Sequence, residues 1–360
     1  MRYISGIDGL RALAILAVMA VHLSTRLFPG GAIGVDIFFV ISGFLITSIL
    51  AREFQNTGTI SLRNFYARRT IRLLPAIVLV VCTATIVSKF VGGPGHHPLI
   101  DGAVTLAFSM DFIRSTSHYA DLSTLGHTWS LAVEEQYYLL WPFCLLGLLG
   151  KWPTRKGLIT GVLIAVVVVW RYYLYATNAP QMRIYYAFDT RADQLLIGSG
   201  LALLAQDSRS KQLLTNLGKL WPLALGAIAY FVLIGYYPGL WFAGPGFVTT
   251  AAASVILLCE VTQNREGRLS KLFSWRPIAW IGTISYGLYL WHWPILLTAR
   301  YLYGGGPLEK HDGSIGHEQM VGILAVLLSV LVADQSYRWV EKPMLAWKRR
   351  FEPKKELKPS

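Results

Sequence analysis

Arg11 and His22 are two ionisable residues inside the first apolar run of the chain, GLRALAILAVMAVHLS. Eleven α-helical positions turn about 1100°, which is three turns plus about 20°, so both side chains project from one stripe roughly 16 Å apart. A cation and an imidazole are costly in lipid, and such groups normally face the interior of a helix bundle and mark a reaction site or a pathway. The imidazole is suited to proton transfer near neutral pH.

A second set of candidate groups lies in HTWSLAVEEQYYLLW. His127, Glu134, Tyr138 and Trp141 fall on one helical stripe at offsets of seven, eleven and fourteen residues, whereas Glu135 points elsewhere. Interfacial aromatic residues and a charge at a helix start would explain these side chains structurally. Because Glu134 lies deeper than a helix cap, we favour a functional or buried-network role for its carboxylate.

Further polar groups interrupt later apolar runs. In ISYGLYLWHWP, Ser285, Tyr289 and His292 share one helix face, which indicates either an imidazole with hydroxyl donors or a structural hydrogen bond between helices. Asp36, in GAIGVDIFFVISGF, needs a partner in lipid, and the glycines around it indicate close helix packing. Arg191, with Asp193 two residues later, opens the run RADQLLIGSG.

Three arginines lie close together in ARRTIRLLP. Arg69 and Arg72 are three residues apart, and Arg68 and Arg72 are four apart, so either pair projects from one helix face. Guanidinium groups bind phosphate oxygens well. The same residues are equally typical of a positively charged cytoplasmic loop. The spacing alone leaves both interpretations open.

Composition assigns these groups to a polytopic helical membrane protein. Of the 360 residues, 54% are hydrophobic and 15% are charged, whereas soluble domains carry about 25% charged residues. The mean hydropathy is +0.45. The expected fold class is all-α, a bundle of about ten transmembrane helices. The expected spans are 8–27, 31–51, 71–91, 128–149, 157–176, 189–206, 220–237, 240–261, 278–301 and 319–340.

The distribution of basic residues orients these spans. The net charge of +13 gathers in short loops, as membrane topology requires, so a nucleic-acid partner is not favoured. All basic loops share one side only if the short stretch 99–113, which contains Asp101 and Asp111, is a re-entrant or interfacial helix. Both termini are then cytoplasmic, and His22 and His292 lie in the outer half of the bundle.

Other sequence features limit the alternatives. Cys82, Cys144 and Cys259 lie in apolar segments without C-x-x-C spacing, so neither disulfides nor a metal site is predicted. The first run lacks a small-x-small cleavage site and is expected to be a permanent helix. We expect one membrane domain over residues 1–345 and a basic cytoplasmic tail over 346–360.

Taken in order along the chain, these patterns resemble the acyltransferase type 3 family of integral membrane acyltransferases. The resembling segments are Arg11 with His22, GVDIFFVISGFLIT, Arg69 with Arg72, WSLAVEEQYYL, RADQLLIGSGLA, ISYGLYLWHWP and SYRWVEKPM. The resemblance covers nearly the whole chain. Some members append an SGNH-type esterase-like domain, and we expect none here because the sequence ends twenty residues after Val340.

The resemblance implies transfer of an acyl group, most often acetyl, from cytoplasmic acyl-CoA. The acceptor would be a hydroxyl of a surface or lipid-linked glycan, such as exopolysaccharide or lipopolysaccharide, at the inner or plasma membrane. Arg69 and Arg72 suit the CoA phosphates. Arg11 is also assigned to the donor, because the stripe from Arg11 to His22 is comparable in length to a pantetheine arm.

The resemblance also suggests catalytic roles. His22 would act as general base toward the sugar hydroxyl, and Asp36 or Glu134 would fix its tautomer. Direct transfer and a route through acyl-histidine both remain open. The side chains assigned to the substrate or the oxyanion are Arg191, Asp193, Ser285, Tyr289 and His292. The alternative is a proton-coupled transporter with a relay through His22, Asp36 and Glu134, although no paired broken helices are evident.

Overall fold

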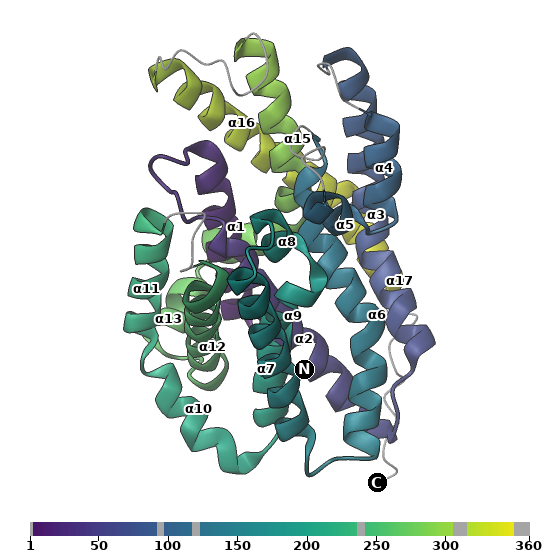
Figure 1. Cartoon of the computed structure of the whole chain (residues 1–360), viewed down its shortest axis with the longest axis vertical. Coiled ribbons are helices and arrows are strands. Elements are labelled where there is room, and N and C mark those ends of the chain that lie inside the picture. The colour runs from purple at the N-terminus through teal and green to yellow at the C-terminus, as the bar shows by residue number, and fades with distance from the viewer. Residues whose placement is uncertain (1–2, 92–96, 117–122, 236–241, 305–314, 349–360) are drawn as a thin grey trace.

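The computed structural model describes residues 3–91, 97–116, 123–235, 242–304 and 315–348, and all regular secondary structure in these ranges is helical (Figure 1). The long helices are α1 (Ser5–Leu23), α2 (Ile33–Thr57), α3 (Leu62–Val91), α6 (Trp129–Gly150), α7 (Lys156–Ala176), α9 (Phe188–Leu204), α11 (Trp221–Ile234), α12 (Phe247–Gln263), α15 (Ser285–Gly304) and α16 (Ile315–Ser336). The short helices are α4 (Pro98–Leu106), α5 (Met110–Thr116), α8 (Gln181–Tyr186), α10 (Lys211–Gly218), α13 (Arg268–Phe273), α14 (Arg276–Thr283) and α17 (Lys342–Lys348).

Each of the ten ranges predicted to span a membrane overlaps one long helix. By length and apolar composition, however, six described helices can cross a bilayer, or seven if α10 and α11, which meet at 57°, form one broken span. The predicted count of ten is therefore not exact. Helix α9, for example, has 17 residues and buries Arg191 and Asp193, because its polar side chains face other helices and not lipid. The chain is an all-α, multi-pass membrane protein.

The short stretch 99–113 does not form a span. It is divided between α4, with nine residues, and α5, with seven, and Phe108 in the connection has a φ of 51°. At about 1.5 Å per residue, neither helix approaches the roughly 30 Å of a hydrocarbon core. Figure 1 shows α4 beside the C-terminal end of α3, at one end of the bundle.

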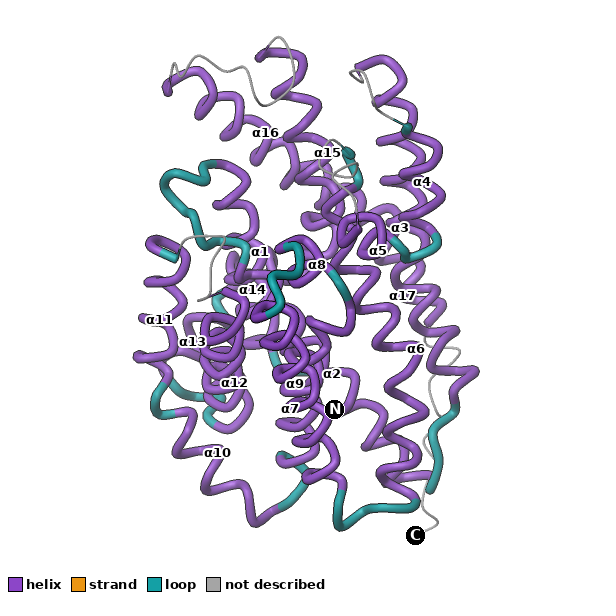
Figure 2. Tube along the Cα trace, in the orientation of Figure 1, coloured by secondary structure: helices purple, strands orange, loops and turns teal. Residues whose placement is uncertain are grey.

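Two basic connections lie at the opposite end of the bundle. The loop from α6 to α7, which contains Lys151 and Arg155, and the connection from α9 to α10 are both found there (Figure 2). Helix α7 therefore leaves this end of the bundle and helix α9 returns to it, as the positive-inside argument requires of these two loops. Residues 349–360 of the predicted basic tail lie outside the described ranges.

Glycines allow the inner helices to approach closely, as the sequence around Asp36 indicated. A Cβ on Gly34 would collide with the Ala14 carbonyl of α1, and one on Gly43 would collide with the Leu195 carbonyl of α9. From α9, Gly198 makes the reciprocal close approach to α2. Helix α2 is therefore held tightly between α1 and α9, which fixes the polar groups that these helices carry.

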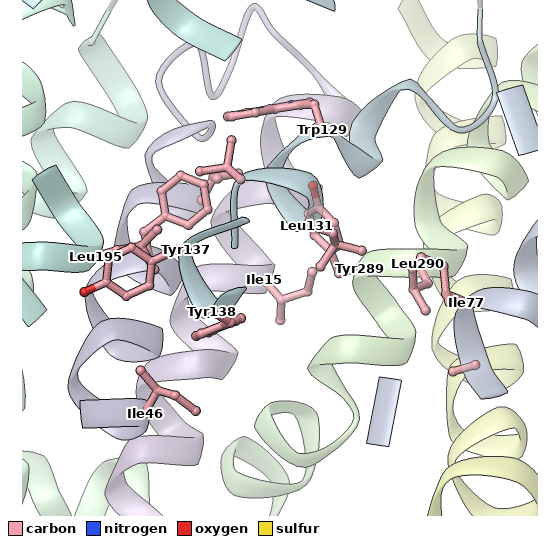
Figure 3. Packing of buried hydrophobic residues seen from close by; sticks show 14 of the residues in the cluster. Ile15, Ile46, Ile77, Trp129, Leu131, Tyr137, Tyr138, Leu195, Tyr289 and Leu290 are labelled. Atoms are coloured by element: carbon pink, nitrogen blue, oxygen red, sulfur yellow. The ribbon is translucent and has the colours of Figure 1, made fainter. Parts of the chain in front are cut away.

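The aromatic core joins α6 and α15 to these inner helices. Figure 3 shows Tyr138 of α6 and Tyr289 of α15 in one cluster with Ile15 of α1 and Ile46 of α2. All four side chains are at most 9% exposed. Because side chains from four helices meet here, their polar neighbours are fixed relative to one another.

Candidate active site

A cavity of about 1160 Å³ lies between α1, α2, α3, α6, α15 and the π-helical turn Tyr337–Glu341. Its volume exceeds the roughly 300–1,000 Å³ of sites for drug-sized ligands, so a long extended ligand would fit. The predicted site residues that line it are Arg11, Arg69, Arg72, Glu134, Ser285 and Tyr289. Those that do not line it are His22, Asp36, Arg191, Asp193 and His292.

The two arginines of the Arg-x-x-Arg segment have different surroundings. The guanidinium of Arg69 forms an ion pair with Glu135 at 2.7 Å, and its central carbon lies 3.3 Å from the centre of the Tyr138 ring. Arg72, one turn later in α3, is exposed to the cavity. Within the described ranges it makes no ion pair or hydrogen bond. Arg72 is therefore the better placed of the two to bind an incoming anion.

Other charged groups balance the cavity wall. Arg11 lies 3.5 Å from Asp8, and the buried Arg68 forms an ion pair with Glu53 at 3.1 Å. Glu341 is 7% exposed and lines the same cavity. Glu53 and Glu341 were not predicted as site residues, because their long-range neighbours are set by tertiary packing. The motif SYRWVEKPM was the only signal that pointed toward Glu341.

Glu134 faces the cavity and not an imidazole. Its carboxylate accepts a hydrogen bond of 2.8 Å from the Ser42 hydroxyl of α2. Glu135, which does not line the cavity, forms an ion pair with Arg69. The expectation that Glu134 orients His22 is not met in this geometry: the hydrogen-bond partner of His22 is a different residue.

Asp36 belongs to a buried ionic network away from the cavity. Its carboxylate is paired with Arg191 of α9, and Asp193 of the same helix pairs with Arg171 of α7 at 2.8 Å. All four side chains are 0–1% exposed, and the Arg191 guanidinium lies 4.0 Å from the centre of the Phe247 ring. The predicted need of Asp36 for a partner is confirmed, but its proposed role at His22 is not. Arg191 and Asp193 likewise join helices and do not reach the cavity.

The predicted base lies in a cluster of imidazoles. Nδ1 of His22 lies 3.1 Å from Nε2 of His292, which projects from α15. The ring of His127 lies 5.4 Å from that of His292, centre to centre. A small cavity of about 10 Å³ adjoins the His22–His292 pair. Among the described residues, no group of His, Cys, Asp and Glu side chains has the arrangement of a metal site.

Tyr289 separates this cluster from the large cavity. Its ring lines the cavity and lies 5.7 Å from the ring of His292. Its hydroxyl donates to the backbone carbonyl of His127, and Ser130 Oγ lies 2.6 Å from the same hydroxyl. Two interpretations of the face with Ser285, Tyr289 and His292 were left open, an imidazole with hydroxyl donors and a structural hydrogen bond between helices. Each of them describes part of this arrangement. Tyr289 makes a structural hydrogen bond between helices, and Ser285 and Tyr289 also line the cavity.

A large cavity lined by arginines and carboxylates therefore lies beside a histidine pair inside a membrane bundle, and such a site is typical of a membrane enzyme. The sequence profile described as "Acyltransferase domain" matches residues 4–334, so the chain belongs to this acyltransferase family. It is 37% identical to the peptidoglycan O-acetyltransferase OatA of Listeria monocytogenes over 361 residues, covering 95% of this chain and 56% of OatA.

Two further relatives give the same coverage. The chain is 35% identical to the putative peptidoglycan O-acetyltransferase YrhL of Bacillus subtilis, covering 95% of this chain and 55% of YrhL. It is 32% identical to the putative O-acetyltransferase SACOL0978 of Staphylococcus aureus, covering 95% and 57%. The chain thus spans little more than half the length of these curated relatives. No solved structure matches it.

Proposed function

We propose that this membrane acyltransferase moves an acetyl group from acyl-CoA at the cytoplasmic face to a hydroxyl of a glycan on the other side of the inner or plasma membrane. The observation that carries the proposal is the cavity: its lining includes Arg72, a cation without an ion pair among the described residues, and Tyr289, which lies beside the His22–His292 pair. The relatives named for O-acetylation of peptidoglycan make peptidoglycan the first acceptor to test.

The donor half of the proposal rests on charge and shape. Phosphate oxygens of CoA would bind the Arg72 guanidinium, with Arg11 as a second cation of the same cavity. The pantetheine arm would extend along the cavity toward Ser130 and Tyr289 at its inner wall. Arg69 would support this wall through Glu135 and Tyr138 and would not be the main phosphate ligand.

The chemical half of the proposal uses His22 as the general base. The acceptor hydroxyl gives its proton to Nε2 of His22 as its oxygen bonds to the thioester carbonyl carbon. The C–S bond then breaks, and the leaving CoA thiolate takes the proton from the imidazolium, so charge and protons balance. Because Tyr289 stands between the cavity and the imidazoles, the thioester reaches His22 only when this side chain moves.

The arrangement does not favour a transporter. A proton relay needs a chain of titratable groups within hydrogen-bond reach of one another. Asp36 is paired with Arg191, and Glu134 is bonded to Ser42, so neither carboxylate continues the path from His22. The carboxylates would therefore serve packing and cavity charge, while the imidazoles would serve acyl transfer.

The proposed orientation has a direct test. Thr116, at the exposed end of α5, follows the stretch 99–113 that the positive-inside argument assigns to the outer side. In intact cells, Thr116→Cys should react with an impermeant maleimide. A cysteine in the loop from α6 to α7 should react only after the membrane is opened. The reverse pattern would place the donor cavity on the wrong side for cytoplasmic acyl-CoA.

The proposed activity is tested with purified protein in proteoliposomes. Acetyl-CoA labelled in the acetyl group is supplied at the basic face, and peptidoglycan or a lipid-linked precursor at the other. We expect label on the glycan with the parent and a loss of at least about a hundredfold with His22→Ala, within the range for general bases. Label transfer that is unchanged by His22→Ala would remove His22 from the mechanism. No labelled glycan from either acceptor, despite donor binding, would overturn the proposed acceptor class.

A further inference from the structure

The two histidines that meet beside Tyr289 come from opposite ends of the chain. His22 lies in the last turn of α1, and His292 lies in α15, two residues before Pro294, which stands inside the helix. Their ring centres are 5.1 Å apart with planes tilted by 34°, and Nε2 of His292 lies 3.1 Å from Nδ1 of His22. His292 is 3% exposed, so this contact is shielded from bulk water.

The backbone of α15 determines which ring nitrogen of His292 carries a proton in this contact. Nδ1 of His292 lies 2.8 Å from the carbonyl oxygen of Tyr289 and 3.1 Å from that of Leu288. A carbonyl oxygen can only accept a hydrogen bond, so Nδ1 of His292 must carry the proton. In a neutral imidazole the other nitrogen is then an acceptor, which makes Nε2 of His292 the acceptor from His22.

The tautomer of His292 in turn determines the tautomer of His22. Its Nδ1 must donate to Nε2 of His292, because two lone pairs at 3.1 Å would repel each other. The remaining nitrogen, Nε2 of His22, then carries a lone pair. The backbone of Val18, one turn earlier in α1, also lies within hydrogen-bond reach of the His22 ring. A carbonyl oxygen there accepts only from a protonated ring nitrogen, which Nδ1 already is, so Nε2 stays unprotonated. This is the protonation state that a general base needs before it takes a proton from a hydroxyl.

We propose that His292 is the positioning residue of this acyltransferase, which holds His22 in the Nδ1–H tautomer with Nε2 free to act as base. This inference rests on the proposed function. His292 takes the place that a carboxylate occupies in a Ser-His-Asp arrangement. A neutral partner avoids the cost of a second buried charge in the membrane interior, which an Asp or Glu beside His22 would add.

Neighbouring side chains fix the position of His22 relative to His292. Arg300, two turns after His292 in α15, donates to the backbone carbonyl of His22 at 2.7 Å. The ring of Trp293 packs 4.6 Å from that of His22, centre to centre. The adjoining cavity of about 10 Å³ is at the lower limit of the space that one water requires, so it matches the size of a single hydroxyl group.

The test separates positioning from a general loss of structure. In His292→Gln the side-chain amide oxygen can still accept from Nδ1 of His22, whereas in His292→Leu no acceptor remains. We expect His292→Leu to lower kcat by at least about tenfold, the lower end of what loss of a histidine-orienting group costs, with KM for acetyl-CoA unchanged. His292→Gln should recover most of that kcat. His97→Gln, an exposed histidine outside the cluster, is the matched control.

A spectroscopic readout makes the inference independent of turnover. In protein labelled with ¹⁵N-histidine, the resonances lost in His22→Ala identify His22. We expect Nδ1 of His22 to show a protonated-type shift in the parent and in His292→Gln, and a tautomer mixture in His292→Leu. An Nε2–H tautomer in the parent would overturn the inference, as would parental kcat in His292→Leu. Full activity of His22→Ala would instead refute the base assigned in the proposed function and leave the tautomer result standing.

Discussion

Separate replacement of the two arginines of the Arg-x-x-Arg segment should give two different defects. Arg72→Ala removes a cation that faces the cavity and has no partner among the described residues. A charge-assisted hydrogen bond is worth about 1.5–3 kcal/mol. Loss of one phosphate contact should therefore weaken acetyl-CoA binding by roughly ten- to a hundredfold. The folded protein should keep its parental melting temperature, because Arg72→Ala breaks no ion pair.

Arg69→Ala should instead lower stability. It leaves Glu135, whose side chain is 19% exposed, without its cation and removes the guanidinium from the Tyr138 ring. The lost partner should cost about 1–3 kcal/mol and the lost cation–π contact about 0.5–1 kcal/mol. We therefore expect a lower melting temperature, with a smaller loss of affinity per correctly folded molecule than in Arg72→Ala.

The assay is titration of detergent-purified variants with acetyl-CoA, with affinity normalised to folded protein and melting measured in parallel. Arg63→Ala is the matched control, because Arg63 is an exposed arginine of the same helix that does not line the cavity. Lysine at position 72 should restore part of the affinity, since it keeps the charge and loses the planar fork. Parental binding by Arg72→Ala, or equal binding defects with unchanged melting in both alanine variants, would refute the reasoning.

Three further outcomes are expected. Asp36→Leu should destabilise the fold by about 3–5 kcal/mol, because Arg191 loses its buried counter-charge. In thermal unfolding, the double variant with Arg191→Met should recover much of this stability. No recovery would show that the pair does more than pack. Gly43→Ala should cost about 1–3 kcal/mol because its Cβ meets a backbone carbonyl of α9, while Gly161→Ala, with open space, should melt like the parent. Tyr289→Ala should raise the hydrolysis of acetyl-CoA measured without glycan, because the wall between the thioester and the imidazoles is removed; hydrolysis at the parental rate would count against a separating role.

The sequence predicted which helices carry polar groups better than it predicted which groups meet. Periodicity gave the faces of Arg69, Glu134 and Tyr289, since neighbours three or four residues apart on one helix are fixed by its geometry. It gave no information on the contact between His22 and His292, which are 270 residues apart. A lone buried Asp36 had to find a cation, but Arg191 could be identified only once α2 and α9 were packed together.

The same limit explains the roles first given to the carboxylates. A catalytic histidine is commonly oriented by Asp or Glu, and Asp36 and Glu134 were the acids expected on the same side of the membrane. Three-dimensional packing instead commits both to other partners and brings a second imidazole to His22. The backbone of α15 places two carbonyl oxygens at Nδ1 of His292. The backbone geometry therefore determines that His22 donates the hydrogen bond and that His292 accepts it.

The separation of the two compartments has a chemical reason under the proposed function. A thioester beside a free imidazole nitrogen and water would be hydrolysed, so an enzyme that accepts its donor before its acceptor must keep them apart. Tyr289 can do so because its hydroxyl is anchored on the backbone of His127, in the 3₁₀ turn Gly126–Thr128 that precedes α6, and on Ser130 at the start of α6. An acceptor that disturbs the start of α6 would thereby release Tyr289 and expose the thioester to His22. Donor and acceptor would then meet at the base only when both are bound, which couples acyl transfer to the presence of the glycan.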